Sequence, residues 1–249
     1  MTNFELIKYE ELQKIEDINF ITTLQKIKRD ISDYHSQIPS RIICINLLRS
    51  ICKFHVSYFF NFFWGIRMDF FKNCLNYKQN PKLQHISLEF LNEVINNIFN
   101  EIPIENINDL IFWIYENIFD FLKNNNNILK SSAEKLIRDI AIMLPCEAII
   151  ICLIKSLKEK DENILDFIFK CLEFNFKEYA SYGISFDYII EDLEIDNLLD
   201  NKDFQDYYRK IKKAFVLFKN IYQSQCGDIA LIVDDLEQKN KPIFVELIK

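Results

Sequence analysis

One amphipathic stripe constrains the fold of this chain more than any other feature. It consists of six small or apolar residues at relative positions 0, 3, 4, 7, 8 and 11: Ala133, Leu136, Ile137, Ile140, Ala141 and Leu144. This spacing places all six on one side of an α-helix, with Lys135 and Arg138 on the other side. Pro145 interrupts the helix because proline lacks an amide hydrogen, and the next segment, Cys146 to Leu157, is apolar on almost every side. Such a helix pair needs similar neighbours to bury its surface.

The same stripe occurs twice earlier in the chain, each time led by a small residue. The leading residues are Ser87, 46 positions before Ala133, and Cys44, another 43 positions earlier. The copies are Ser87, Phe90, Leu91, Val94, Ile95, Ile98 and Cys44, Leu47, Leu48, Ile51, Cys52, His55. A weaker copy starts at Ile164. Because HEAT and armadillo repeats have periods of about 40–47 residues, we predict an all-α fold, an α-solenoid of about five HEAT- or armadillo-like helical repeats.

The predicted boundaries divide the chain into three parts. Residues 1–19 form a charged lead-in, residues 20–223 the HEAT-like α-solenoid, and residues 224–249 a tail. The expected helices are Phe20–Tyr34 with Arg41–His55, Tyr58–Leu75 with Pro81–Phe99, Ile107–Leu122 with Leu129–Leu144, Cys146–Leu157 with Asn163–Phe174, and a closing helix within Asp203–Gln223. In the tail, the β-prone runs Ile229–Val233 and Ile243–Ile248 leave two alternatives, a short hairpin or a docked segment.

The composition excludes several other classes of protein. Three glycines and five prolines in 249 residues leave too little turn chemistry for a sandwich or barrel, and no glycine-rich phosphate loop. A net charge of −7 argues against nucleic acid as a partner. Seven cysteines without paired spacing indicate reduced thiols, and Met1–Asp17 lacks the apolar run of a secretory signal. The most apolar segment, Phe54–Leu75, is interrupted by charges, so we expect a cytoplasmic protein with no membrane partner.

Candidate catalytic and metal-binding residues are few. Cys52 and His55 are three positions apart on a helix, a spacing that a metal ion can use. Both lie on the apolar stripe and no second pair accompanies them, so we expect them to pack in the core. No nucleophile or metalloprotease motif occurs in the sequence. We therefore predict a protein without enzymatic activity, cofactor or metal.

Charges divide unevenly between the two kinds of turn that a stack of helix pairs would have. Turns within repeats line one edge of such a stack, and they carry seven lysines against one acid, Glu159: Lys78, Lys82, Lys123, Lys130, Lys155, Lys158 and Lys160. Turns between repeats carry glutamates instead: Glu101, Glu105, Glu173 and Glu178. An acidic cluster at Glu191–Asp200 interrupts the pattern. The lysines either form a docking strip for an acidic partner or merely stabilise helix ends through the helix dipole.

Three segments carry a resemblance to a known family. They are LLRSICKFH (Leu47–His55), NPKLQHISLEFLNEVINNI (Asn80–Ile98) and NNILKSSAEKLIRDIAIMLP (Asn126–Pro145). Together they resemble a TOG domain over residues 20–174, most closely those of crescerin-type regulators of axonemal microtubules and more distantly those of CLASP proteins. Arg41 matches the basic residue that opens the second helix of the first repeat. The family's tryptophan shortly before it is missing here, and Ile38 or Tyr34 stands in its place.

The resemblance implies a function. TOG domains are arrays of HEAT repeats that bind tubulin through the within-repeat turns, which form the lysine-bearing edge of this chain. The resemblance thus implies a location at the cytoskeleton, in a cilium or axoneme. It also implies a tubulin- or microtubule-binding site formed by Tyr34, Arg41, Lys78, Lys82, Lys123, Lys130, Lys158 and Lys160. The alternative is a HEAT-repeat scaffold within a larger protein assembly, without tubulin contact. Exposed phenylalanines on the segment Tyr58–Phe71 would favour that alternative.

Overall fold

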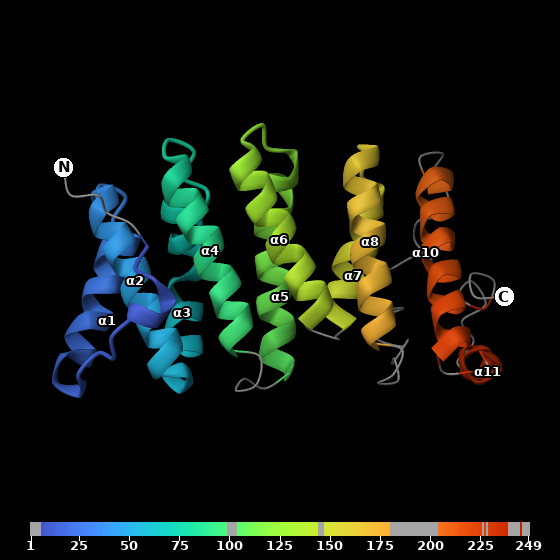
Figure 1. Ribbon diagram of the computed structural model, residues 1–249, viewed down its shortest axis with the longest axis horizontal. Coiled ribbons are helices and arrows are strands. Elements are labelled where there is room, and N and C mark those ends of the chain that lie inside the picture. Colours follow the sequence, from blue (N-terminus) through green and yellow to red (C-terminus); the bar gives the residue numbers. More distant parts are fainter. Residues whose placement is uncertain are drawn as a thin grey trace. The chain divides into compact units, whose positions relative to one another are not determined.

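A computed structural model gives the fold of the chain. It describes residues 6–98, 104–143, 147–179, 204–225, 227, 229–238 and 245. Across these ranges the regular elements are all helical, and none of the described residues lies in a strand (Figure 1). None of the described helices is long and apolar enough to cross a membrane. The prediction of an all-α fold is confirmed.

Most helices begin and end close to the predicted positions. The described helices are α1 (Asp17–Ser32), α2 (Ile38–Phe54), α3 (Val56–Phe70), α4 (Pro81–Ile98), α5 (Ile104–Ile118), α6 (Asn127–Met143), α7 (Glu147–Lys155), α8 (Glu162–Tyr179), α10 (Phe204–Gln225) and α11 (Ala230–Gln238). Among them, α8 ends five residues later than predicted, and α11 was not predicted. Three of the predicted helices end in an irregular turn: the π turn η2 (Phe71–Leu75) after α3, and the 3-10 turns η3 (Phe119–Lys123) and η4 (Ser156–Lys158) after α5 and α7. The predicted lengths were therefore correct, and the change in helix type at these ends was not predicted.

The described helices belong to two compact units. One comprises residues Met1–Ile107 with Asn117–Leu136, and the other Asn108–Glu116 with Ile137–Lys249. In the first unit α1 packs against α2, and η2, which continues α3, packs against α4. In addition α1 contacts α3, and α2 contacts α4. The first helices of the two pairs, α1 and α3, therefore contact each other, and so do the second helices, α2 and α4. This is a repeat-like arrangement.

The repeated register marks the core of the second helices. Cys44, Ser87 and Ala133 hold equivalent places in α2, α4 and α6, and each is fully buried. The Ser87 hydroxyl donates to the Leu83 carbonyl at 2.8 Å, which satisfies its polar group inside the core. The described stripe residues that follow in α4 and α6 are buried as well: Phe90, Leu91, Val94, Ile95, Leu136, Ile137, Ile140 and Ala141. The small leading residue thus predicted the buried face correctly.

An aromatic cluster joins α3 to α4. Phe59, Phe63 and Phe70 of α3 surround Phe90 of α4, with ring centroids 5.4 to 6.1 Å apart in edge-to-face contacts. Each ring is almost completely buried. Pairs of this kind contribute about 0.5–1.5 kcal/mol each beyond the burial of their apolar area. The phenylalanine-rich segment is therefore mainly a core element.

Asparagine or aspartate side chains cap the N-termini of three of the helices. The amides of Leu83, Ile128 and Asn163 donate to the side-chain oxygens of the capping residues, at 2.8, 3.0 and 2.9 Å respectively. The capping residues are Asn80 for α4, Asn126 for α6 and Asp161 for α8. These caps satisfy amides that have no partner within the first helical turn, and each contributes about 1 kcal/mol.

In the second unit, α7 is buried on all sides. Every residue from Ala148 to Ile154 is buried, which confirms the prediction that this apolar helix is enclosed by neighbours. Helix α8 contacts both α7 and α10. Two hydrogen bonds reinforce the packing of this unit. The Tyr207 hydroxyl of α10 donates to the Ile154 carbonyl of α7 at 3.3 Å, and the Asn175 side-chain amide of α8 donates to the Ala141 carbonyl of α6 at 2.9 Å.

Of the two alternatives for the tail, the structure contradicts the hairpin. The first run of the hairpin alternative, Ile229–Val233, falls in a turn and in helix α11, so it is not a strand. Residues 230–233 lie within the nine-residue helix α11, whose intrahelical bonds satisfy the backbone locally. The second run, Ile243–Ile248, and the acidic cluster Glu191–Asp200 lie outside the described residues, except for Val245, which is buried. The described part of the charged lead-in before α1, residues 6–16, lies against α2 and α4 and contains the short 3-10 turn η1 (Tyr9–Glu11).

Candidate partner-binding edge

The turns that lead into α2, α4 and α6 are neighbours in the first unit. Together with the first residues of α4 and α6 we call them the turn edge: residues 33–37, 76–82 and 123–130. The first two are joined by Arg41 of α2, whose Nη2 donates to the Tyr34 carbonyl at 2.6 Å and whose Cζ lies 4.9 Å from the centre of the Tyr77 ring. Its Nη1 donates to the Asn73 carbonyl of η2 at 2.7 Å, just before the second turn. The last two turns line a common hollow. The predicted neighbourhood of the within-repeat turns is therefore present within this unit.

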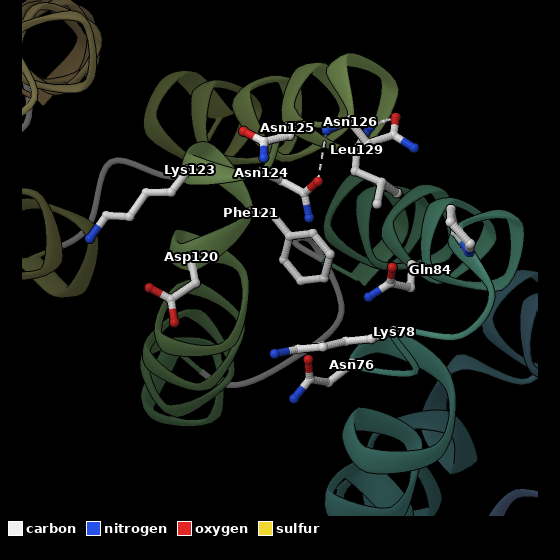
Figure 2. A pocket seen from close by; sticks show the side chains of 11 residues that line it. Asn76, Lys78, Gln84, Asp120, Phe121, Lys123, Asn124, Asn125, Asn126 and Leu129 are labelled. Atoms are coloured by element: carbon white, nitrogen blue, oxygen red, sulfur yellow. Dashed lines mark hydrogen bonds between the residues drawn. The ribbon is translucent and has the colours of Figure 1, made fainter.

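The hollow between the second and third turns has a volume of about 530 Å³, and polar side chains line it together with Pro81, Phe121 and Leu129 (Figure 2). Asn76 and Lys78 stand on one side, Asn124 and Asn126 on the opposite side, and Phe121 lies between them (Figure 2). Its charged lining residues are Lys78, Lys123 and Asp120. Ammonium groups and side-chain amides can bind a carboxylate, so the hollow fits an acidic or amide-bearing side chain of a partner.

The predicted lysines of the first unit differ in exposure. Lys78, Lys82 and Lys123 are exposed, whereas Lys130 is half-buried. The Lys123 ammonium lies 5.7 Å from the centre of the Phe119 ring, a distance compatible with a cation–π contact. Tyr34, in the first turn, is 54% exposed and its ring lies edge-on to that of His35. These five side chains can reach a partner from the turn edge.

Lys158 and Lys160 belong to the turn between α7 and α8 in the second unit, and both are exposed. The Lys158 ammonium lies 5.2 Å from the centre of the Tyr207 ring. Lys210 of α10 donates to the Glu159 carbonyl at 2.9 Å, so α10 holds this turn in place. The turn therefore presents lysines from a fixed backbone.

Arg41 does not belong to the accessible surface, and its predicted contact with a partner is wrong. The side chain is 1% exposed, and its guanidinium donates to the carbonyls of Asn73, Tyr34 and Asp33. It also lies over the Tyr77 ring, with 4.9 Å between Cζ and the ring centre. A guanidinium satisfies several carbonyls at once, which explains why a charged residue is tolerated there. Arg41 positions the first two turns instead of contacting a partner.

One recurring polar position was not predicted from the sequence. Three residues before the small leading residues stand Arg41, Gln84 and Lys130, each at the fourth position of its helix. Gln84 is buried and donates to the Leu75 carbonyl at 3.1 Å, as Arg41 does to Asn73. Arg41 and Gln84 thus both bind carbonyls of η2, which follows α2 and precedes α4 in the chain, and the carbonyls at a helix end lack intrahelical partners. The sequence shows this signal as a long polar residue three positions before each small leading residue, but its role depends on which helix end lies next to it in the fold.

Groups with strongly shifted pKa values lie in the core instead of the turn edge. Burial raises the pKa of the Cys44 and Cys74 thiols to about 12, and burial also raises the pKa of the Tyr207 hydroxyl to about 12. These three groups are therefore protonated at neutral pH. Among the described residues, no group of three or more His, Cys, Asp or Glu side chains could hold a metal ion. Cys52 is buried in α2, and the His55 ring contacts the Ile15 carbonyl and the Phe20 ring.

Comparisons with known proteins do not assign the chain to a family. No protein-family model matches the sequence, and no curated protein matches it either.

Proposed function

We propose that the chain is a non-enzymatic, TOG-like binding module that engages tubulin or the microtubule lattice through its turn edge. The observation that carries the proposal is that the second and third turns meet around one polar hollow bordered by exposed lysines. Tubulin presents an acidic surface, which matches such an edge in charge. A location at the cytoskeleton, in a cilium or axoneme, belongs to the same proposal.

An α-solenoid of about five HEAT-like repeats is the architecture that this proposal requires. Its support is the contact pattern of the first unit, where α1 lies beside α3 and α2 beside α4. The pairing of α7 with α8, followed by the packing of α10 on α8, extends the same kind of arrangement within the second unit. Small residues at equivalent buried positions in α2, α4 and α6 support a common repeat unit.

The partner-facing residues of the proposal are those of the predicted set that the fold leaves accessible. In the first unit they are Tyr34, Lys78, Lys82, Lys123 and Lys130, of which Lys130 is half-buried. In the second unit they are Lys158 and Lys160. Exposed charges are individually weak and screened by salt, so no single lysine should dominate. We expect the affinity to arise from their sum and to decrease as the ionic strength rises.

The test is co-sedimentation with microtubules, together with gel filtration in the presence of free tubulin, at low and moderate salt. The triple variant Lys78→Glu, Lys82→Glu, Lys130→Glu should lose binding while its circular dichroism remains that of the wild type. A matched control reverses three exposed lysines away from the turn edge, Lys14, Lys26 and Lys28. The proposal fails if the two triple variants bind alike, because net charge alone would then explain the effect.

A scaffold without tubulin contact is the second candidate, and one observation favours it. On α3, Tyr58 and Met68 are 62% and 60% exposed. The phenylalanines of α3 do not share this exposure, because Phe59, Phe63 and Phe70 are buried and Phe60 and Phe62 are half-buried. Absence of microtubule binding at low salt, combined with lost assembly of a Tyr58→Ser, Met68→Ser variant with another protein, would favour the scaffold.

A further inference from the structure

Residues 6–12, which we call the strap, lie across the second helices of the first unit (Figure 1). Two of the strap's backbone groups are bound at Ile7, whose amide donates to the Asn46 Oδ1 at 3.2 Å and whose carbonyl accepts from the Arg49 Nη1 at 2.6 Å. Further along, the Lys53 ammonium donates to the Tyr9 carbonyl at 2.7 Å. Main-chain groups, which every peptide possesses, therefore make these three contacts. Between Tyr9 and Glu11 the strap forms the 3-10 turn η1, in which the Leu12 amide donates to the Tyr9 carbonyl at 3.3 Å.

The surface beneath the strap is organised by an ion pair. Arg49 of α2 is 3% exposed, and its Nε and Nη2 donate to the two carboxylate oxygens of Glu93 of α4, both at 2.6 Å. This bidentate pair fixes the guanidinium plane and directs Nη1 toward the strap carbonyl. Asn46 Oδ1 accepts a bond from the same Nη1 at 2.8 Å and is thereby oriented as well.

Two strap side chains supply specificity. The Tyr9 hydroxyl donates to the Asn97 Oδ1 at 2.8 Å, and the Lys53 ammonium lies 4.6 Å from the centre of the Tyr9 ring. Leu12 is buried, with 5% of its surface exposed. By contrast, Lys8, Glu10 and Glu11 are exposed. The contacts thus select a tyrosine and, three residues later, a leucine, and leave the intervening positions free to vary.

We propose that Asn46, Arg49, Lys53, Glu93 and Asn97 form a peptide-binding site, the strap site, for a segment of another protein that forms a short 3-10 turn and carries a tyrosine followed three residues later by a leucine. The chain's own strap occupies the site and competes with that partner. A tethered competitor acts at an effective concentration of about millimolar, so the partner binds appreciably only when it is abundant or when the strap is weakened. This surface is separate from the turn edge, and the proposal does not depend on tubulin binding.

The experiment uses the full-length chain and a fluorescent synthetic peptide with the sequence of residues 1–16, followed by fluorescence anisotropy. A Tyr9→Ala, Leu12→Ala double variant, whose strap is weakened, should bind the peptide saturably. The wild type should bind it about tenfold more weakly or worse, because its intact strap competes. A second peptide with serine at Lys8, Glu10 and Glu11 should bind as well as the first, whereas a peptide with alanine at Tyr9 and Leu12 should not bind.

A matched pair of substitutions tests the site itself in the double variant. Asn97→Ala removes the acceptor of the tyrosine hydroxyl and should weaken peptide binding about fivefold, the equivalent of one neutral hydrogen bond. Asn96→Ala, at the next position of α4, removes only a bond to the Asn92 carbonyl within the same helix and should leave binding unchanged. Equal effects of the two substitutions would overturn the assignment of the site.

Hydrogen–deuterium exchange on the wild type gives a second measurement that needs no substitution. Residues 6–12 should exchange faster than α2 and α4, because a displaceable strap opens without unfolding of the helices beneath it. Exchange of the strap only together with α2 and α4, or unfolding of the double variant, would overturn the proposal by making the strap an integral part of the core. A concentration-dependent dimer of the wild type formed through the strap would overturn the choice of partner, since a second copy would then be the occupant.

Discussion

Replacement of Arg41 by methionine tests whether this residue holds the turns in place or contacts a partner. Methionine fills much of the same volume but donates no hydrogen bond, so the carbonyls of Asn73 and Tyr34 lose their charged donor. The two short bonds, at 2.7 and 2.6 Å, are charge-assisted, and bonds of this kind contribute about 1.5–3 kcal/mol each. Part of the stability lost with these bonds is recovered, because the variant no longer has to desolvate a buried guanidinium. We expect the free energy of unfolding to fall by about 3 kcal/mol.

The assay is urea unfolding followed by far-ultraviolet circular dichroism, with two variants for comparison. Arg41→Lys keeps the charge but not the planar fork, and should cost about half as much. Gln84→Met removes a single neutral bond at the equivalent position of α4 and should cost about 1–2 kcal/mol. A loss below about 1 kcal/mol for Arg41→Met, together with abolished microtubule binding, would refute the structural role and return Arg41 to the partner surface.

Two further predictions concern a cap and a thiol. Asn126→Ala should lower the free energy of unfolding by about 1 kcal/mol, because the first-turn amides of α6 lose their acceptor; Asn125→Ala, at an exposed position, should change it by less than about 0.5 kcal/mol. Stability should fall as the pH rises from 9 to 12, because burial raises the pKa of Cys74 from 9.0 to about 12 and the unfolded state releases this proton first. Urea midpoints measured across this range should decrease less steeply for Cys74→Ala, and an equal slope would contradict the assignment.

The periodic stripes predicted the helices and their buried faces because both depend on local spacing. An apolar residue every three or four positions must lie on one face of a helix, whatever the neighbours are. The caps at Asn80, Asn126 and Asp161 are likewise local, since each side chain bonds to amides two or three residues ahead. Helix starts could therefore be placed within a few residues, and the small leading residues identified the tightest packing positions.

The candidate site was only partly predictable for the opposite reason. Exposed lysines such as Lys78 and Lys123 were correctly placed in turns, since a charged residue in a turn is usually solvated. Whether two turns meet around a hollow depends on how successive helix pairs stack, and spacing along the chain does not specify this. Arg41 was misassigned because its partners, Asn73 and Tyr34, are 32 and 7 residues away and become neighbours only in the folded state.

By itself, the sequence determined that this protein is helical, where its helices lie, which faces they bury and where its lysines are concentrated. The tertiary structure alone decided that Arg41 is a buried link between turns, that residues 6–12 cover α2 and α4, and that the first part of the tail is helical. The physical reason is the separation along the chain of the residues that interact. Helix periodicity and capping act over a few residues, whereas the bonds of Ile7 to Asn46 and of Arg49 to Glu93 join positions 39 and 44 residues apart and depend on the packing of whole helices.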